Sequence, residues 1–201
     1  MARALLLRHG ESVHNAHSGT ESLADDVGDR LTERGRRQAE AAGAALRGRG
    51  ITRLLSSEMG RARETAELVG SAIGLDPETL EYAGELPLGE PFEQALDRVR
   101  RLRAELDAGA WGELPLLVTH GIYIRFFLLD SVLGDGFTPA VGGGIWRLGS
   151  VNCGLTTFSR GEVRDPSGAE VPGWTCLSWM ERPWDPHRPA AARSERPATA
   201  R

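Results

Sequence analysis

The sequence predicts an α/β fold, a three-layer α/β/α sandwich built on a mostly parallel central sheet. The first observation is a series of short apolar runs with the length of buried strands, at 4–7, 51–55 and 115–119. The second is that a segment with helical apolar spacing follows each run. Parallel strands need such helical connections, so the alternation favours one sheet covered by helices on both faces. The chain of 201 residues is long enough to bury one full core.

Caps and apolar faces set the limits of the expected helices. Thr32 can cap a helix that continues to about Ala45, and Gly48 and Gly50 mark its end. Within residues 92–107, apolar side chains recur at spacings of three and four, which defines one helix face. The remaining expectations are helices over 58–73 and 122–133 and two further strands near 145–148 and 155–158.

The composition excludes several classes of function. Every basic residue is an arginine, so a Walker-A lysine, a pyridoxal phosphate Schiff base and a lysine nucleophile are all excluded. A net charge of -4 argues against broad binding of nucleic acid, which needs a basic surface. No apolar stretch has the length of a membrane span, and charges interrupt the first apolar run. We therefore expect a cytoplasmic protein that binds neither nucleic acid nor membrane. Cys153 and Cys176 form no CxxC pair and are expected to be small core residues.

Polar clusters follow three of the predicted strands. Residues 8–11 (Arg-His-Gly-Glu) follow the first, Ser57 with Arg61 follows the second, and His120 with Gly121 follows the third. The carboxyl ends of strands in an open α/β sheet converge on a ligand crevice. Two histidines and two arginines are therefore expected in one site.

This set of side chains suits phosphoryl transfer. The transferred group carries negative charge on three oxygens, and arginine forks bind such oxygens in a fixed geometry. A neutral histidine nitrogen can attack phosphorus and form a phosphohistidine without a separate base. Helices that start after the second and third clusters add amide donors. The chemistry needs no metal and no cofactor.

Four segments in a fixed order resemble a known family. The first is LLLRHGESVHN at 5–15, and the others are DRLTERGRRQA at 29–39, SSEMGRARETAELV at 56–69 and LLVTHGIYIRFFL at 116–128. With Asn152 they are similar to the histidine phosphatase superfamily, also called the phosphoglycerate mutase-like family. The resemblance implies a histidine phosphatase domain over 1–164, with a short cap insertion at about 85–111.

The resemblance also implies roles for individual residues. His9 would be the nucleophile, and His120 would be a second catalytic histidine that donates to the phosphate. Arg8 and Arg61 would complete the phosphate pocket, with Gly121 at the start of the last helix. Asn15 matches a position that contacts phosphate, although capping of its loop is the alternative, and Ser12 lies close by. Glu11 is expected to be structural, paired with Arg8 or with backbone amides.

The general acid is a carboxylate after the second helix in this family. Glu85 and Glu90 fit an E-x-x-x-G-E pattern, and we expect Glu85 to be the acid, with Glu81 and Glu90 as rivals. Discrimination between substrates is expected in the cap segment and in the segment 165–187. The arginines of that segment (Arg98, Arg100, Arg101 and Arg103) are expected on a solvated face, although one of them could reach an anionic substrate.

Beyond residue 164 prolines recur, and no regular element is expected. Residues 165–187 form a Pro- and Trp-rich segment, in which Trp174, Trp179 and Trp184 act either as a strap over the core or as a lid over the site. Residues 188–201 are expected to be a disordered tail.

The favoured function is a metal-independent phosphatase that hydrolyses a small phosphorylated metabolite through a phosphohistidine. The nearest alternative is a phosphoglycerate mutase-like phosphotransferase. It is disfavoured because the segment between Glu85 and His120 contains no tyrosine and no lysine. A non-catalytic phosphate-binding module and a metal hydrolase using His9, His14 and His17 are the remaining alternatives. A homodimer is left open.

Overall fold

The computed structural model describes residues 2–17, 25–86, 90–164, 167–182 and 184–185. Its strands form one six-stranded sheet in the order β3-β2-β4-β1-β5-β6. The strands are β1 (Arg3–Arg8), β2 (Arg53–Ser57), β3 (Pro77–Leu80), β4 (Pro115–Thr119), β5 (Leu155–Arg164) and β6 (Glu170–Glu181). The helices are α1 (Val13–Ala16), α2 (Asp25–Gly28), α3 (Glu33–Leu46), α4 (Gly60–Ile73), α5 (Phe92–Asp107), α6 (Gly121–Leu133) and α7 (Pro139–Gly142). Single 3-10 turns are η1 (Glu81–Ala83), η2 (Gly134–Gly136) and η3 (Gly143–Arg147).

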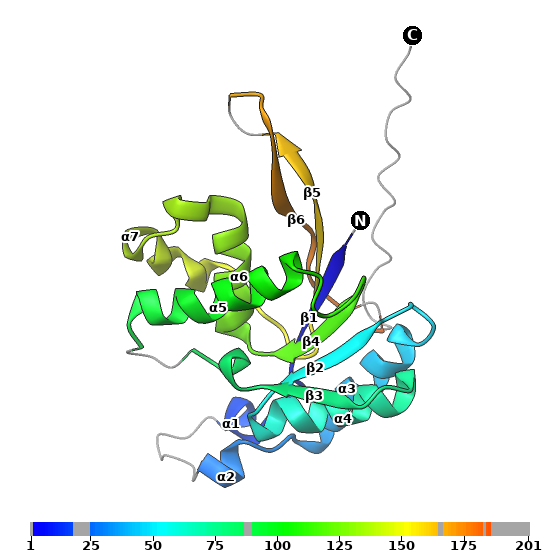
Figure 1. Ribbon diagram of the computed structural model, residues 1–201. Coiled ribbons are helices and arrows are strands. Elements are labelled where there is room, and N and C mark those ends of the chain that lie inside the picture. The colour runs from blue at the N-terminus through cyan, green and yellow to red at the C-terminus, as the bar shows by residue number, and fades with distance from the viewer. Residues whose placement is uncertain (1, 18–24, 87–89, 165–166, 183, 186–201) are drawn as a thin grey trace.

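The central strands are parallel, as predicted. β4 pairs in parallel with β1 and β2, and β2 pairs in parallel with β3. β5 and β6 are antiparallel and extend beyond the other strands as a long hairpin (Figure 1). The predicted mostly parallel sheet is therefore confirmed for the four strands that surround the polar clusters.

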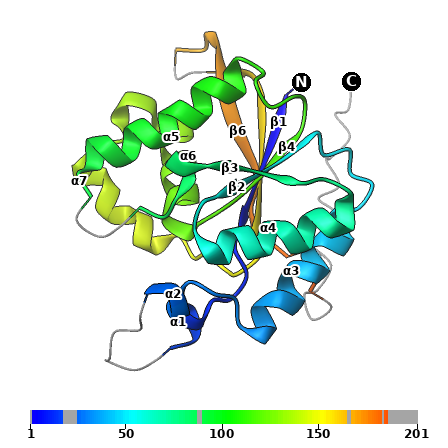
Figure 2. The same cartoon turned by 60° about the horizontal axis from the view of Figure 1, so that its bottom comes forward.

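Helices cover both faces of the sheet, which confirms the predicted sandwich. Figure 2 shows α3 and α4 on one side of the sheet and α5 and α6 on the other. Side chains alternate along β1 accordingly: Leu5 and Leu7 pack in the core beneath α3 and α4, and Leu6 packs in the core beneath α5 and α6. The two cores hold the strands rigidly, so that their carboxyl ends form a firm base for a site.

One predicted strand is wrong, and one edge strand was not predicted. Residues 145–148, predicted as a strand, belong mainly to the 3-10 turn η3, where Ile145 is buried but Trp146 is 56% exposed. The run of glycines before this turn favours a tight path outside the sheet over an extended strand. β3 was not predicted, because in this edge strand only Leu80 is buried and the apolar signal is weak.

The region after residue 164 also differs from the prediction, because β6 is a regular strand of twelve residues. Pro172 lies within it, opposite Glu162 of β5. Proline is tolerated there because β6 is an edge strand, and the backbone groups on its outer side have no neighbouring strand to bond. The predicted tail at 188–201 lies outside the described residues. No helix in the described ranges has the length and apolarity needed to cross a membrane.

Candidate active site

The three polar clusters come together at the ends of β1, β2 and β4, which are neighbours in the sheet. The ring centroids of His9 and His120 are 5.2 Å apart. Arg61 Nε donates to His9 Nε2 at 3.2 Å, which joins the second cluster to the first. Ser57 Oγ lies 2.8 Å from His120 Nε2, which joins the second cluster to the third. The convergence expected from the strand order is therefore present.

Two glycines allow the loop after β1 to approach α3. A Cβ at Gly10 would lie 2.5 Å from the carbonyl oxygen of Gly35, and a Cβ at Gly35 would lie 2.0 Å from the carbonyl oxygen of Glu11. Either side chain would collide with backbone, so the turn that carries His9 requires glycine at both positions. The amide of Gly10 also donates to Thr65 Oγ1 of α4 at 3.0 Å.

His9 is held in the form that a nucleophile needs. Its Nδ1 lies 2.7 Å from the carbonyl oxygen of Gly10, which can only accept, so Nδ1 carries the proton. The lone pair is then on Nε2, the nitrogen that faces Arg61. Burial lowers the pKa of His9 well below its usual value, and Arg61 and Arg8 lower it further. The imidazole is therefore neutral near pH 7, and its Nε2 lone pair carries no proton and accepts a hydrogen bond from Arg61.

The hydroxyl of Ser57 orients the second histidine. The amide of Met59 donates to Ser57 Oγ at 3.2 Å, so the hydroxyl proton is available for His120 Nε2. This arrangement favours the tautomer of His120 with its proton on Nδ1. Burial lowers the pKa of His120 well below its usual value, with a further contribution from His9. His120 is thus a neutral donor whose orientation is fixed by β2.

Arg61 is fixed by a residue that the sequence reasoning did not select. Its Nη1 donates to Asp29 Oδ1 at 2.5 Å, and Asp29 Oδ2 accepts from the amide of Gly60 at 2.5 Å. Asp29 therefore caps the start of α4 and orients the Arg61 guanidinium at the same time. Arg8 is oriented differently, because its Nη1 donates to the carbonyl and to the hydroxyl of Ser150 at 3.1 and 3.2 Å.

Buried donors without partners are concentrated at this site. In the described part of the chain, three buried side-chain polar atoms have no hydrogen-bond partner, and two of them are Arg8 Nε and His120 Nδ1. Leaving a buried donor unpaired costs about 1–3 kcal/mol. Both atoms belong to residues of the polar clusters at the strand ends, so they are available to an anionic ligand.

Glu85 lies beside the same groups. Its Oε1 accepts from the amide of Ile122 at the start of α6 at 3.2 Å and from the amide of Leu86 at 3.1 Å. Burial raises the pKa of Glu85, while the backbone amides of Leu86 and Tyr123 and the nearby charges of Arg61 and Arg8 lower it in part. The structure thus brings Glu85 to the site, as expected, in surroundings that favour its protonated form.

The rival carboxylates are placed differently. Glu90 accepts two hydrogen bonds from Arg98 Nη1, at 3.0 and 2.9 Å, and Glu81 is exposed. Arg98 also donates to the carbonyl oxygens of Tyr82 and Gly84. The Arg98–Glu90 pair therefore braces the chain on both sides of Glu85.

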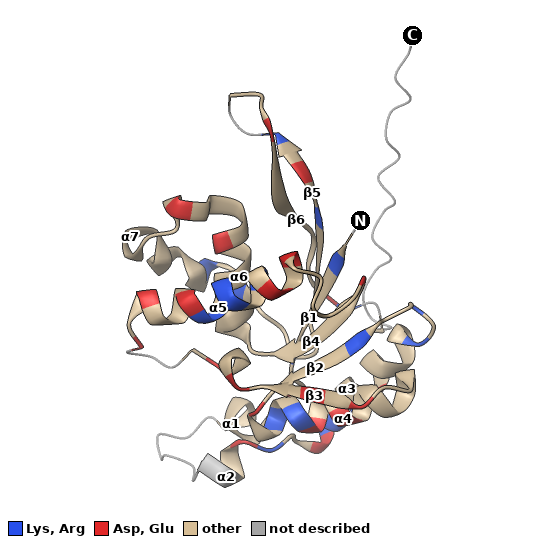
Figure 3. Cartoon of the chain, viewed as in Figure 1, with Lys and Arg blue, Asp and Glu red and all other residues tan. Residues whose placement is uncertain are grey.

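The prediction of a solvated arginine face on α5 is wrong for three of its four residues. Arg98 braces the Glu85 loop, and Arg100 and Arg103 both bind the fully buried carboxylate of Asp130 on α6. Only Arg101 matches the expectation, since its side chain is 63% exposed. Figure 3 shows the row of arginines on α5. Arg100 and Arg103 join α5 to α6, and the side-chain hydrogen bonds of all four arginines go to groups other than His9 and His120.

Three polar residues near His9 serve the loop that follows β1. Ser12 is fully buried and caps α1 by accepting from the amide of Asn15. Asn15 Oδ1 accepts from Asn152 Nδ2, which also donates to the carbonyl oxygen of His9. Asn15 also caps α1, because its side chain accepts from the amide of Ser12. A role of Asn15 in phosphate binding stays a prediction. Glu11 is structural, as expected, but its partners are Thr32 and Arg34 and not Arg8.

The other predicted candidates lie outside this cluster. His14 and His17 are exposed on and next to α1. Trp174 packs in the core and its Nε1 donates to Asp107, Trp179 Nε1 donates to the carbonyl oxygen of Gly149, and Trp184 packs against the core beneath α3 and α4. Cys153 is fully buried and burial raises its pKa to about 12, whereas Cys176 is half-buried.

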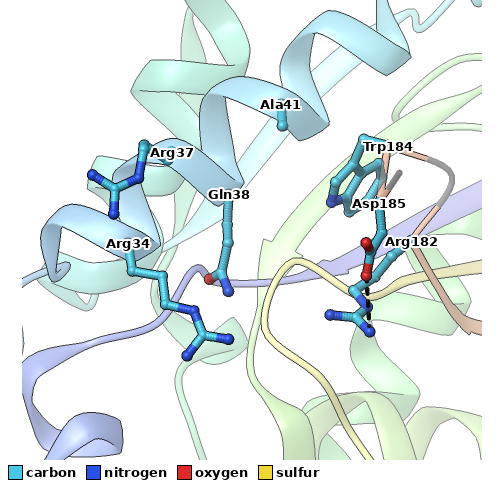
Figure 4. A pocket seen from close by; sticks show the side chains of 7 residues that line it. All are labelled: Arg34, Arg37, Gln38, Ala41, Arg182, Trp184 and Asp185. Carbon is cyan, nitrogen blue, oxygen red and sulfur yellow. Dashed lines mark ion pairs between the residues drawn. The ribbon is translucent and has the colours of Figure 1, made fainter. Parts of the chain in front are cut away.

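A hollow of about 240 Å³ lies between α3 and the chain at Arg182, Trp184 and Asp185 (Figure 4). Its arginines have carboxylate partners: Arg34 pairs with Glu11, and Arg182 pairs with Asp185 as the dashed line shows. Gln38, which also lines it, accepts from the amide of Glu11. The residues that line the hollow thus contact the loop that follows β1, and neither His9 nor His120 is among them.

The fold and the site are typical of a phosphoryl-transfer protein with two histidines, and the similarity of the chain to known proteins agrees with this. Residues 4–89 match the model of the histidine phosphatase superfamily (branch 1). The probable phosphoglycerate mutase GpmB of Citrobacter koseri is 31% identical over 87% of this chain and 90% of its own length. GpmB of Salmonella paratyphi B is 30% identical over 90% of this chain and 91% of its own. The chain belongs to the histidine phosphatase superfamily.

Solved structures show the same fold. A native mycobacterial glucosyl-3-phosphoglycerate phosphatase is 25% identical, with a TM-score of 0.67 over 89% of this chain and 98% of that one. A phosphoserine phosphatase from Entamoeba histolytica, solved as an H9A mutant with phosphoserine, is 18% identical, with a TM-score of 0.69 over 92% of this chain and 99% of that one.

Proposed function

We propose that this protein is a metal-independent phosphatase that hydrolyses a small phosphorylated metabolite in the cytoplasm through a phosphohistidine at His9. The observation that carries the proposal is the state of the His9 ring. Its Nδ1 proton is bound to the carbonyl of Gly10, its Nε2 lone pair faces the phosphate donors, and its pKa is lowered by burial. Such a nitrogen can attack without a separate base.

In the first step His9 Nε2 forms a bond to phosphorus, and the bond between phosphorus and the ester oxygen breaks. Glu85 gives its proton to the departing oxygen, so the alcohol leaves neutral. Arg8, Arg61 and His120 donate to the phosphoryl oxygens and stabilise the charge on them in the transition state. Gly121 adds the start of α6 to this pocket, because its small size allows the phosphate to approach the helix amides.

In the second step water attacks the phosphorus of the phosphohistidine. The ionised Glu85 takes a proton from that water, and the bond between phosphorus and His9 Nε2 breaks. Inorganic phosphate leaves, His9 is again neutral and Glu85 is again protonated. One carboxylate thus acts first as acid and then as base.

The second candidate is a mutase, which is favoured by the name of the GpmB relatives. A mutase returns the phosphoryl group to another hydroxyl of its substrate. The segment between Glu85 and His120 supports hydrolysis instead, because it contributes no tyrosine or lysine that could hold a sugar acid between two phosphoryl transfers. A non-catalytic phosphate-binding protein would not require Glu85, a carboxyl group beside the histidines whose pKa is raised by desolvation.

The test is a screen of phosphate monoesters that measures both inorganic phosphate and isomerised product. We expect release of phosphate, an acid-labile and base-stable phosphoenzyme, and loss of both in His9→Ala. His14→Ala is the matched control, because His14 is exposed and lies five residues further along the chain. Isomerised product without phosphate would support the mutase. Turnover by His9→Ala, or activity that a chelator removes and zinc restores, would overturn the proposal.

A further inference from the structure

The side chain of Met59 lies between a phosphate donor and the proposed acid. Met59 immediately precedes α4, and its Sδ accepts a hydrogen bond from Arg61 Nη2 at 3.5 Å. The same sulfur accepts from the amide of Glu85 at 3.4 Å. A thioether is a weak acceptor, but it is polarisable and adapts to an irregular space. One uncharged side chain thus connects the start of α4 with the loop that carries Glu85.

The backbone of Met59 is held in place on both sides. Its amide donates to Ser57 Oγ at 3.2 Å, and its carbonyl oxygen accepts from the amides of Ala62 and Arg63 at 2.9 and 3.0 Å. The hydroxyl of Ser57 also lies 2.8 Å from His120 Nε2. The short segment between β2 and α4 therefore places the second histidine and the thioether together.

Arg61 has other partners besides the thioether. Its Nε donates to His9 Nε2, and its Nη1 forms the ion pair with Asp29. Hydrogen bonds between charged groups are stronger than a bond to a neutral sulfur. Loss of the thioether would therefore leave Arg61 with its charged partner and close to its position.

The acid depends on the thioether more directly. Thr119 Oγ1 donates to the carbonyl oxygen of Ala83 at 2.7 Å, which anchors the chain two residues before Glu85. The bond to Met59 Sδ is made by the amide of Glu85 itself, at the point where the carboxyl side chain leaves the backbone. Removing the sulfur would thus release the acid while the preceding residues stay anchored.

We propose that Met59 is a positioning residue, whose thioether sets the position of Glu85 relative to Arg61. The proposal rests on the proposed function, because it concerns the acid of that same reaction. The acid must reach the departing ester oxygen while Arg61 binds oxygens of the same phosphoryl group. A single acceptor shared by both residues keeps their separation constant. Small displacements of a catalytic group lower the rate, so this separation matters.

The test compares wild type, Met59→Leu and Met59→Gln in the single-turnover formation of phosphohistidine from ethyl phosphate and from p-nitrophenyl phosphate. Leucine has a similar volume but no acceptor, whereas glutamine has a similar length and an oxygen that accepts from both N–H groups. With ethyl phosphate we expect Met59→Leu to be about 2- to 10-fold slower, as for the loss of one neutral hydrogen bond, and Met59→Gln to keep most of the rate. With p-nitrophenyl phosphate the loss should be smaller, because its leaving group needs little acid.

The pH profile distinguishes positioning from a general loss of structure. A released Glu85 admits water to its carboxyl group, so the rise in its pKa that burial causes should become smaller. Cleavage of ethyl phosphate needs the protonated acid, so the rate of Met59→Leu should fall at a lower pH than the rate of the wild type. Met180→Leu is the matched control, because Met180 packs in the core, and its rates and profile should match the wild type.

Wild-type rates and an unchanged pH profile in Met59→Leu would overturn the proposal. Equal slowing of both esters, or a loss that Met59→Gln shares with Met59→Leu, would also overturn it, since neither result needs an acceptor that positions the acid. If Met59→Leu does not fold, Met59→Ala takes its place. His9-dependent turnover that is the same in all Met59 variants overturns the role of Met59 alone, whereas no His9-dependent turnover of any ester overturns the phosphatase as well.

Discussion

Glu85→Gln separates proton transfer from the binding of phosphate. Glu85 Oε1 accepts from the amides of Leu86 and Ile122 at 3.1 and 3.2 Å, and a glutamine oxygen can accept the same two bonds. The substitution therefore keeps the position of the side chain and removes only its proton. Loss of general acid catalysis slows reactions by about 10²- to 10⁴-fold, which corresponds to about 3–5 kcal/mol in the activation free energy. We expect a decrease of that size for an alkyl phosphate.

The decrease should depend on the leaving group. An alkoxide needs a proton as it leaves, whereas an aryl oxide is already stable as an anion, so an aryl phosphate should lose much less. The pH profile should change as well. Burial raises the pKa of Glu85, and the negative charge of a bound phosphoryl group raises it further. Cleavage of the alkyl ester should fall as the pH rises through that value, and Glu85→Gln should lack this dependence.

The assay is the single-turnover formation of phosphohistidine from ethyl phosphate and from p-nitrophenyl phosphate. Single-turnover conditions are needed because the same carboxylate activates water in the second step and could limit the rate for both esters. Glu81→Gln and Glu90→Gln are the controls, since Glu81 is exposed and Glu90 is bound by Arg98. Equal slowing of phosphorylation for both esters would refute an acid role for Glu85. No slowing at all would transfer the role to whichever control variant shows the difference.

Two further predictions concern the histidines. Ser57→Ala should lower kcat about 5- to 150-fold, because it leaves His120 Nε2 without its partner. Ser56→Ala is the control and should have little effect, because the Ser56 hydroxyl donates to a backbone carbonyl. Equal kcat in the two variants would contradict the orienting role of Ser57. His9 and His120 bind protons less readily when folded than when unfolded, so the free energy of unfolding should fall as the pH drops below about 6.5, by up to about 1.4 kcal/mol per pH unit for each histidine. Urea unfolding at several pH values checks this, and an unchanged slope in His9→Asn would contradict it.

The three strands that carry the polar clusters, β1, β2 and β4, were predictable from the sequence because their signals are local. An apolar run such as 115–119 is buried along its whole length, and the polar residue that follows it must leave the sheet. The parallel arrangement then brings His9 and His120 to one edge without any knowledge of distant contacts. The same reasoning fails for 145–148, where an apolar pattern lies on a turn outside the sheet. Periodicity alone does not distinguish these two cases.

The supporting residues were not predictable because their roles depend on distant contacts. Asp29 orients Arg61 from a loop 32 residues earlier in the chain, and Arg98 braces the Glu85 loop from the middle of α5. Neither has a local pattern that distinguishes it from an exposed charge. The resemblance to the family includes Asn152, but only the structure shows that this residue connects Asn15 to the carbonyl of His9.

Burial and pairing together divide the arginines of this chain into those that hold the fold and those that are available to a ligand. Arg100 and Arg103 share the buried Asp130, so their charge is compensated within the protein. Arg8 and Arg125 are also largely removed from water, but their partners are hydroxyl and carbonyl groups that carry no charge. A buried cation of this second kind gains most when an anion arrives, because both its charge and its unpaired N–H groups are then satisfied. The two such arginines border one space beside Gly121, and their combined charge therefore favours an anionic group of a ligand in that space.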